Sequence, residues 1–536
     1  MLFLLCSDQG AGDIMKVKSV HIHNFRSIYD AKISLTDYSI LVGENNVGKS
    51  NVIDAIRCFY GDVKFQEQDW HRFRPKSDKE AWIEIEYSLE DAEYNRLGKQ
   101  YRVAPNTLTV RKDLVSGNYH GITTNGLAKT SFYNSSPDNP RALGNIIYVP
   151  AVVDVKENVN MSGTSALSGL VNTICQKPSF VTQYETQIRT FLKGLNAVFA
   201  PCFRKVNNDI NREIGSTGVR VNIGPRNNIS TADMSKFILN VAVQEVGADM
   251  DLNQLGTGVQ RRIISSLIKT SVQYSEQYNK KTANKAPNMP QNHNNNGFSP
   301  RMDLLLFEEP EVSLHPEAIK DLAYDLRKFA TDKYQQVLAT THSSLLLSED
   351  VADINSVIRV EKSGKKTVIH QSGLPETDLN AIRNLVYFDR PRSDMFFSKK
   401  VVLVEGPTEY KLYDYLRRRG DIPRNLAQQA TVIETVGKWS MPYFIKVLNG
   451  LNIRYSLLYD LDGNPNRQDN LDVQNACTDL LDYSYGFPKD IETFCGTRKQ
   501  GNHVINLIKE FDDGTIPAQT QNQVVDIFKK LLTHTK

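Results

Sequence analysis

The fold of this 536-residue chain is decided by one octapeptide, GENNVGKS at Gly43–Ser50. It fits G-x-x-x-x-G-K-S/T, the phosphate-binding P-loop, in which glycines let backbone N–H groups turn inward around phosphates. The run SILV at 39–42 predicts a buried strand before the loop, and NVIDAI at 51–56 predicts a helix after it. This strand–loop–helix setting predicts an α/β domain that binds a nucleotide.

Each position in the octapeptide has a predicted role. The backbone around the phosphates is expected from Gly43, Asn45, Asn46 and Gly48. The Lys49 ammonium would reach the outer phosphates and the Ser50 hydroxyl would hold Mg²⁺, while the helix N-terminus adds positive potential. ATP and Mg²⁺ are therefore the expected ligands. The alternative, a glycine-rich turn with a stray lysine, gives no reason for the serine and both glycines.

Length and composition bound the class of protein. A chain of this length should hold two or more domains, each with its own core. Its 64 basic and 61 acidic side chains leave a net charge of +3, so any DNA contact must come from local patches. The six scattered cysteines form no C-x-x-C pair, which argues against zinc and disulfides and favours a cytoplasmic location. No apolar run approaches the ~20 residues that a membrane helix needs.

Alternation and periodicity predict how the chain is organised. Short strands, most of them in an antiparallel sheet beside the nucleotide fold, are predicted at 17–22, 81–87, 107–112, 119–124 and 145–150. Apolar residues spaced three to four apart over 180–214 predict an amphipathic helix, which is either core or a dimer contact. Residues 275–300 have little to bury and predict a flexible surface loop. Residues 1–14 are interpreted as an extension ahead of the fold.

A second strand is expected to supply acids to the nucleotide site. The run DLLLFEEP at 303–310 is apolar and ends in two carboxylates. Beside a P-loop, such a strand places one acid on the Mg²⁺ shell and the next near the attacking water. We therefore predict a metal role for Glu308 and a catalytic, water-polarising role for Glu309. Gln66 or Gln68 is a candidate for a glutamine that reaches the Mg²⁺.

Further stretches follow in the order seen in ABC-type ATPases. NQLGTGVQRR at 253–262 resembles the signature loop, in which Gly256, Thr257 and Gly258 would cap the γ-phosphate bound by an opposing protomer. It departs from the usual Leu-Ser-Gly-Gly, and a plain glycine loop at a helix start is the alternative. His342, at the end of the strand VLATTHS, resembles the switch histidine that contacts the γ-phosphate. An active signature loop implies a homodimer or higher homo-oligomer with nucleotide sandwiched between protomers.

The C-terminal third carries a second acidic constellation. Glu405 follows the apolar strand of VVLVEGPTE with Glu409 one helical turn later, and Asp460 and Asp462 end the strand of LLYDLDG. If these strands are adjacent and parallel, four carboxylates gather at one sheet edge, where divalent cations would neutralise them. All-oxygen ligands favour Mg²⁺ or Mn²⁺ over zinc, and two such ions can clamp both oxygens of a phosphodiester displacement.

This pattern resembles the Toprim domain of topoisomerases, primases and some nucleases. The resemblance adds Glu492 as a further metal ligand and Lys499 as a catalytic lysine that stabilises charge on the phosphate, a role for which Lys489 competes. An ABC-type ATPase domain at 15–390, with a helical insertion at about 151–235, followed by a Toprim domain at 391–536 resembles the OLD (overcoming lysogenization defect) nuclease family. The arginine that often follows Pro-Ala in that family is absent after Ala151.

The resemblance implies an ATP-binding, metal-dependent DNA endonuclease, gated by ATP and assembled through its ATPase domains. It also implies a role in anti-phage defence, as in Gabija-type and retron-associated systems, where the partner would be a reverse transcriptase with its retron nucleic acid. Two alternatives stay open, a DNA-tethering ATPase like the SMC/RecF group and a topoisomerase- or primase-like Toprim enzyme. The sequence lacks the long heptad arms of SMC proteins, and no separate domain for a strand-cleaving tyrosine fits the remaining length.

Overall fold

The structure, a computed structural model of the chain, describes residues 15–132, 143–151, 302–312, 314–331, 335–347, 354–385, 390–497 and 502–533, with the short strands β9 (Val243–Glu245) and β10 (Ala248–Met250). The chain divides into two compact units, and the unit of Asp13–Asn145 with Asn292–Lys536 contains nearly all of these residues. In the other unit, β9 and β10 pair antiparallel. The predictions for 1–14, 180–214, the helical insertion, 275–300, Gly256–Gly258 and Lys499 lie outside the described residues.

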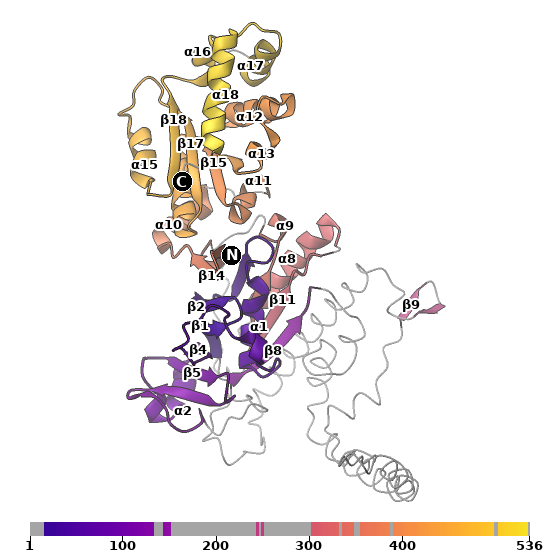
Figure 1. Cartoon of the computed structure of the whole chain (residues 1–536), viewed down its shortest axis with the longest axis vertical. Coiled ribbons are helices and arrows are strands. Elements are labelled where there is room, and N and C mark those ends of the chain that lie inside the picture. The colour runs from indigo at the N-terminus through magenta and orange to yellow at the C-terminus, as the bar shows by residue number, and fades with distance from the viewer. Residues whose placement is uncertain are drawn as a thin grey trace, which may run out of the picture. The chain divides into compact units, whose positions relative to one another are not determined.

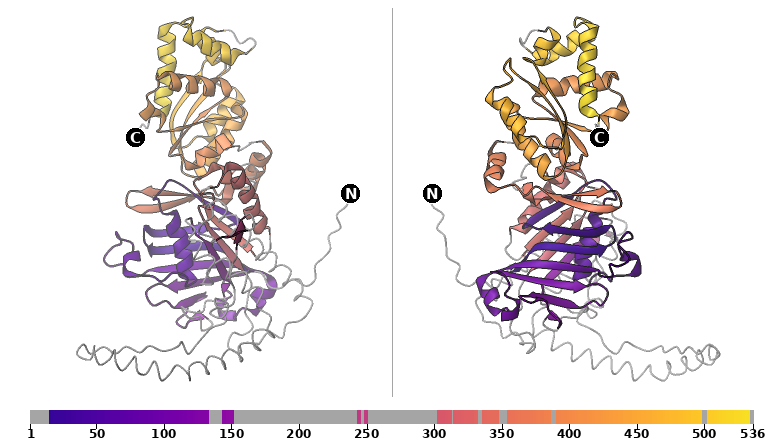
Figure 2. Two further views of the ribbon diagram at one scale, coloured as in Figure 1. Left: turned by 90° about the vertical axis from the view of Figure 1, so that its right-hand side faces the viewer. Right: turned by 60° about the vertical axis from the view of Figure 1, so that its left-hand side comes forward.

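The first sheet confirms the antiparallel strands that alternation predicted. Its order is β2-β1-β4-β5-β6-β7, and its longer strands lie side by side as indigo and purple arrows in the right-hand view of Figure 2. The strands are β1 (Met15–Phe25), β2 (Ile28–Ser34), β4 (Trp82–Leu89), β5 (Thr107–Asp113), β6 (Tyr119–Thr123) and β7 (Gly126–Leu127). Cross-strand pairs such as Val20 with Ile85 and Ile22 with Ile83 are fully buried, so one face of this sheet forms core.

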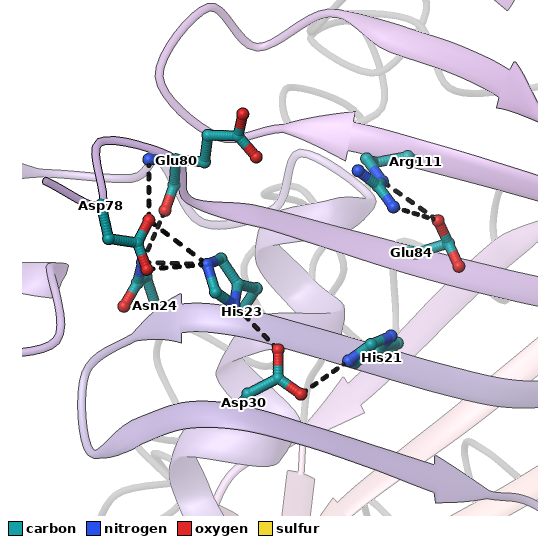
Figure 3. Close-up of polar contacts among 8 residues, drawn as sticks. All are labelled: His21, His23, Asn24, Asp30, Asp78, Glu80, Glu84 and Arg111. Atoms are coloured by element: carbon teal, nitrogen blue, oxygen red, sulfur yellow. Dashed lines mark hydrogen bonds and ion pairs between the residues drawn. The ribbon is translucent and has the colours of Figure 1, made fainter. Parts of the chain in front are cut away.

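The other face of this sheet carries paired charges (Figure 3). His23 lies between two carboxylates, with Nδ1 at 2.8 Å from Asp30 and Nε2 at 3.2 Å from Asp78. His21 Nε2 is 3.0 Å from the second oxygen of Asp30. Arg111 donates two hydrogen bonds, of 3.0 and 2.8 Å, to one oxygen of Glu84. In this group the carboxylates of Asp30, Asp78 and Glu84 pair with the basic side chains, so it is not the local basic patch that DNA would need.

The second sheet contains the strand of the P-loop and is parallel at its centre. Its order is β14-β13-β3-β12-β11-β8, in which β13, β3, β12 and β11 run parallel and β14 is antiparallel to β13. The strands are β3 (Tyr38–Val42), β8 (Asn145–Val149), β11 (Asp303–Glu308), β12 (Gln335–Thr340), β13 (Val357–Ser363) and β14 (Lys366–Gln371). The predicted strands at 39–42, 303–308 and 337–340 are thus neighbours, and their carboxyl ends meet at one edge.

Helices follow the strands of both sheets, and α1 is the helix that the run at 51–56 predicts. They are α1 (Lys49–Phe59), α2 (Asp91–Arg96), α8 (Pro316–Ala330), α9 (Ser344–Leu347), α10 (Glu376–Leu385) and α11 (Arg390–Ser393). Helix α1 begins directly after Gly48 and buries Val52, Ile53 and Ile56. It therefore points its N-terminus at the P-loop, as the motif requires.

The third sheet has four parallel strands and helices on both faces (Figure 1). In the order β16-β15-β17-β18, its strands are β16 (Thr431–Glu434), β15 (Lys400–Val404), β17 (Arg454–Asp460) and β18 (Leu481–Phe487). Its helices are α12 (Pro407–Arg419), α13 (Arg424–Ala427), α14 (Met441–Gly450), α15 (Gln468–Ala476), α16 (Ile491–Cys495), α17 (His503–Asp512) and α18 (Ala518–Leu532).

Strand β15 is apolar from Val401 to Val404 because both faces of this sheet are covered. Leu403 belongs to the core that contains residues of α14 and α15, whereas Val404 belongs to the core built on α12 and α18. The pairing of β15 with β17 is parallel, with Val404 opposite Leu458, as predicted for the two acidic strands.

None of the described helices combines the length and the hydropathy that a membrane crossing requires.

Candidate functional site

The P-loop packs so closely against β13 and β14 that its two glycines leave no room for a side chain. Gly43 has φ 146°, and a Cβ there would lie 2.1 Å from the carbonyl oxygen of Val360. Gly48 has φ 114°, and its Cβ would lie 2.5 Å from Thr367 Oγ1. Both positions are thus required by the packing of the sheet as well as by the approach of phosphates.

A chain of hydrogen bonds supports the loop from behind. Asn51 Nδ2 donates to Ser27 Oγ at 2.6 Å, and Thr367 Oγ1 donates to the carbonyl of Val47 at 2.7 Å. The Ser27 and Thr367 hydroxyl oxygens are 2.6 Å apart. Because the Thr367 hydroxyl already donates its proton to the Val47 carbonyl, Ser27 is the donor in the hydrogen bond to Thr367. The loop therefore holds its shape through contacts with β14 and with the turn between β1 and β2.

Lys49 is buried at the centre of this site. Its Nζ donates to the carbonyls of Gly43 at 3.0 Å and Glu44 at 2.8 Å, and it lies 2.8 Å from His342 Nε2. Burial lowers the pKa of Lys49 to about 8, although the carboxylates of the β11 end oppose the shift. Burial and the Lys49 charge also lower the pKa of His342.

Two glutamates after β11 organise the edge that faces Lys49. Glu309 has φ 41°, its N–H donates to the carbonyl of Thr340 at 3.1 Å, and its Oε1 lies 3.2 Å from His342 Nε2. Glu311 is buried, and its Oε1 accepts from Thr341 Oγ1 at 2.7 Å and from the His342 N–H at 2.8 Å. Glu311 therefore positions the loop that carries His342, a role that sequence reasoning missed.

The structure brings most of the predicted ATPase residues to one place. Lys49, Glu309 and His342 form a contact group, and Glu308 ends β11 opposite Thr340 at the same edge. Asn45, Asn46 and Ser50 lie in the loop and in the first turn of α1. Gln66 and Gln68 are exposed and hydrogen-bonded to each other at 3.0 Å, so a metal role for either stays a prediction.

In the third sheet, here called the Toprim sheet, the acidic residues at the ends of β15 and β17 are in direct contact. The backbone N–H of Asp460, at the end of β17, donates to Glu405 Oε2 at 3.0 Å. Burial raises the pKa of Glu405, and the nearby Asp462 carboxylate adds to the shift. Glu409 accepts from the N–H of Gly406 at 3.1 Å in the first turn of α12. Burial, and then the charges of Asp460 and Glu405, raise the pKa of Glu409 to about 8.

A lysine that sequence reasoning missed completes this group. Lys438 follows β16, and its Nζ donates at 2.6 Å to both the Asp460 carbonyl and Asp462 Oδ2. Arg467, more exposed, also pairs with Asp462 at 3.0 Å. The sequence feature that could have indicated this lysine is the Gly437-Lys438 pair, which comes shortly after a short apolar strand. Because neighbouring parallel strands end at the same edge of a sheet, a residue after that strand can reach the acidic residues.

Of the other predicted residues of this site, Glu492 and Lys489 lie within the described part of the chain and Lys499 does not. Glu492 is buried in α16, 3.4 Å from Thr408 Oγ1 and 3.6 Å from His503 Nε2. Lys489 has an exposed side chain, and its carbonyl accepts the Asp462 N–H at 3.0 Å, so residues 488–492 pass beside the Asp-x-Asp turn. Lys499 lies outside the described residues, so its role stays a prediction.

We call the sheet edge that carries Glu405, Glu409, Asp460 and Asp462 the acidic edge. The chemistry of its side chains suits a divalent cation. Its donors are carboxylate oxygens, which Mg²⁺ and Mn²⁺ prefer. Burial and neighbouring negative charges raise the pKa of Glu405 and of Glu409, and a bound cation would oppose both effects. Across the described residues, however, the side chains of His, Cys, Asp and Glu do not form a group of three already arranged around a metal position.

These two sites define the class of protein, a P-loop ATPase domain followed by a Toprim domain. Comparison with known families agrees. The AAA ATPase domain matches residues 15–145 and 154–347, more than half of the chain, and the Overcoming lysogenization defect protein-like TOPRIM domain matches residues 396–462. The chain therefore belongs to the AAA ATPase domain family, in the OLD-like form in which a TOPRIM domain follows the ATPase domain.

Three known proteins that are similar in sequence to this chain are named as nucleases. The chain is 24% identical over 489 residues to the Old nuclease of Escherichia phage P2, which covers 84% of this chain and 77% of that protein. It is 21% identical to the OLD nuclease of Thermus scotoductus (83% and 82% covered) and 22% identical to Endonuclease GajA of Bacillus cereus (84% and 75% covered). These findings confirm the resemblance to OLD proteins and support ATPase and nuclease activities that use a nucleotide and a divalent metal.

Proposed function

We propose that this protein is an ATP-gated DNA endonuclease that hydrolyses phosphodiester bonds at the acidic edge of its Toprim sheet. The observation that carries the proposal is the parallel pairing of β15 with β17, which sets Glu405 against Asp460 within hydrogen-bonding distance. A cluster of buried carboxylates is costly without cations, and a structural role gives no reason to collect them.

In the ATPase domain, the residues around Lys49 would bind and hydrolyse ATP. Lys49 would exchange the carbonyls of Gly43 and Glu44 for phosphate oxygens, which bind an ammonium more strongly. Ser50 and Glu308 would hold Mg²⁺. Glu309 would orient the attacking water, and His342, which already contacts both Lys49 and Glu309, would sense the γ-phosphate.

In the Toprim domain, Glu405, Glu409, Asp460 and Asp462, with Glu492, would hold Mg²⁺ or Mn²⁺. Such ions supply a water of lowered pKa and neutralise the leaving oxygen. The backbone fixes the ligands in advance, because the Asp460 N–H and the Gly406 N–H each hold one glutamate. A lysine, with Lys499 as the sequence-based candidate, would stabilise charge on the reacting phosphate.

Supercoiled plasmid separates this proposal from its alternatives. With Mg²⁺ or Mn²⁺, with and without ATP, an endonuclease gives nicked or linear product. A topoisomerase gives relaxed closed circles, and a DNA-tethering ATPase leaves the plasmid unchanged. Glu405→Ala should abolish cutting and keep ATP binding, because the P-loop lies on another sheet.

The matched control for that variant is Glu434→Ala. Glu434 ends the neighbouring strand β16 opposite Val404, so it tests loss of a strand-end glutamate from the same sheet. We expect the control to cut at the wild-type rate. Full cutting by Glu405→Ala, or equal loss in both variants, would contradict the assignment of the site.

The cellular role is proposed from the OLD-like domain content. We propose a cytoplasmic homo-oligomer, assembled through its ATPase domains, that cuts DNA in defence against phage. A partner such as a reverse transcriptase with its retron nucleic acid belongs to the same proposal. Plaque counts on cells that express the wild type or Glu405→Ala test the defence role, since equal phage resistance in both would argue against cutting as its basis.

A further inference from the structure

Lys438 places a positive charge inside the acidic edge of the Toprim sheet. Its Nζ lies 2.6 Å from Asp462 Oδ2, 2.6 Å from the Asp460 carbonyl and 3.6 Å from Asp469 Oδ2. The side chain is 4% exposed, whereas the other cation of this group, Arg467, is 53% exposed. Two of these oxygens accept hydrogen bonds from the ammonium, and the Asp469 carboxylate adds a longer ion pair.

The fold itself sets the position of Lys438. In the loop before it, the Thr435 N–H donates to the Val404 carbonyl at 2.9 Å and the Gly437 N–H donates to the Glu405 carbonyl at 3.1 Å. Gly437 has φ 92°, and the Ser440 hydroxyl closes the turn by donating to the Gly437 carbonyl at 2.9 Å. The backbone that carries Glu405 therefore also holds the loop that carries Lys438.

The position of this ammonium makes it a competitor for a divalent cation. It binds Asp462, one of the carboxylates proposed to hold the metal, and Coulomb repulsion between like charges a few ångströms apart disfavours both at once. Without a metal, the same ammonium offsets the repulsion among Glu405, Asp460 and Asp462, because these carboxylates meet at one edge of the sheet.

We propose that Lys438 is a positioning residue that acts as the built-in counter-ion of the Toprim site. It holds the acidic strand ends together in the metal-free protein and yields Asp462 when a divalent cation binds. The inference rests on the proposed metal-dependent nuclease function. It assigns Lys438 a second effect, which is to weaken metal binding and so raise the metal concentration at which the site fills.

The test is Lys438→Met, which keeps the length of the side chain and removes its charge. Calorimetric titration with Mn²⁺ should show affinity increased roughly tenfold, the factor that corresponds to ~1.4 kcal/mol of relieved competition. The metal-free variant should melt at a lower temperature than the wild type, and saturating Mn²⁺ should remove most of that difference. Unchanged or weaker Mn²⁺ affinity would overturn the proposal.

Two further variants keep the result interpretable. Lys530→Met removes an exposed lysine of α18 in the same domain and should leave both Mn²⁺ affinity and melting temperature at wild-type values. Lys438→Arg keeps the charge and should bind Mn²⁺ as weakly as the wild type; if Lys438→Met does not fold without metal, tight binding by Lys438→Arg overturns the proposal. Stronger Mn²⁺ binding by Lys438→Met in a protein that never cuts DNA supports the counter-ion and contradicts only the nuclease function.

Discussion

The ammonium of Lys49 lies 2.8 Å from Nε2 of His342, a residue 293 positions further along the chain. The contact exists because β12 pairs in parallel with β3, so the residues that follow the two strands meet at one edge. Glu309, after the next strand, reaches the same imidazole. The ATPase site is therefore assembled from three strand ends, and each end can be tested separately.

Lys49→Ala should remove nucleotide binding. Hydrogen bonds from a charged donor contribute ~1.5–3 kcal/mol each, so losing the ammonium should weaken ATP affinity by roughly tenfold to a hundredfold or more. Calorimetry with ATP and Mg²⁺ measures this. The exposed Lys64, just beyond α1, supplies the control, and Lys64→Ala should bind ATP normally. Wild-type affinity in Lys49→Ala would refute the predicted role.

Glu309→Gln should slow ATP hydrolysis and preserve ATP binding. Removing a general base typically costs ~10²–10⁴-fold in rate, whereas the neutral amide leaves the phosphate contacts of Lys49 in place. Phosphate release and ATP affinity are measured on the same preparation. Glu317→Gln, an exposed position in the first turn of α8, is the control. Normal ATP turnover in Glu309→Gln would mean that another residue activates the attacking water.

Gly43→Ala should destabilise the protein more than Gly126→Ala. Both glycines have positive φ, so each substitution carries a left-handed strain of ~1–2 kcal/mol. Only at Gly43 does the added Cβ meet backbone, 2.1 Å from the Val360 carbonyl, while a Cβ at Gly126 meets open space. Denaturation midpoints of the two variants measure the difference. Equal losses would mean that β13 moves away without cost.

Glu93→Gln should remove a pH-dependent part of the stability. Burial, and then the charge of Glu90, raise the pKa of Glu93 from its ordinary value of 4.5 to about 7. A raised carboxyl pKa stabilises the folded state below the unfolded value, and this contribution is lost as the pH rises through about 7. The variant should therefore gain melting temperature relative to the wild type between pH 5 and pH 8. The exposed Glu67→Gln is the control, and a parallel pH profile for wild type and Glu93→Gln would contradict the shift.

Gly258→Glu should block ATP-dependent closure of two protomers. If the predicted signature loop caps the partner's γ-phosphate, the new carboxylate faces it at ~4 Å, which costs about 4 kcal/mol at an effective dielectric of ~20. Each protomer should still bind ATP. Mixing Gly258→Glu with Lys49→Ala protomers should restore part of the ATP turnover, since a mixed dimer keeps one intact composite site. Mixtures as inactive as either parent would show that the loop does not act across an interface.

The sequence predicted the parts of this protein whose signals are local. The P-loop octapeptide, the apolar strands before Glu308, Glu405 and Asp460, and the alternating strands of the antiparallel sheet all depend on neighbouring residues, and the structure confirms these elements. The acidic residues could be predicted because parallel strands carry their functional side chains at the carboxyl end. The OLD-like domain order followed from motifs in sequence.

The tertiary structure alone decided which distant side chains complete each site. Glu311 fixes the His342 loop, Thr367 supports the P-loop from β14, and Lys438 enters the acidic edge from β16. A lone glutamate, threonine or lysine carries no periodic signal, since its role depends on which strands become neighbours. Strand order is set by packing and by long-range pairing, so the sequence determined the chemistry that this protein carries, and the fold determined which charges face one another.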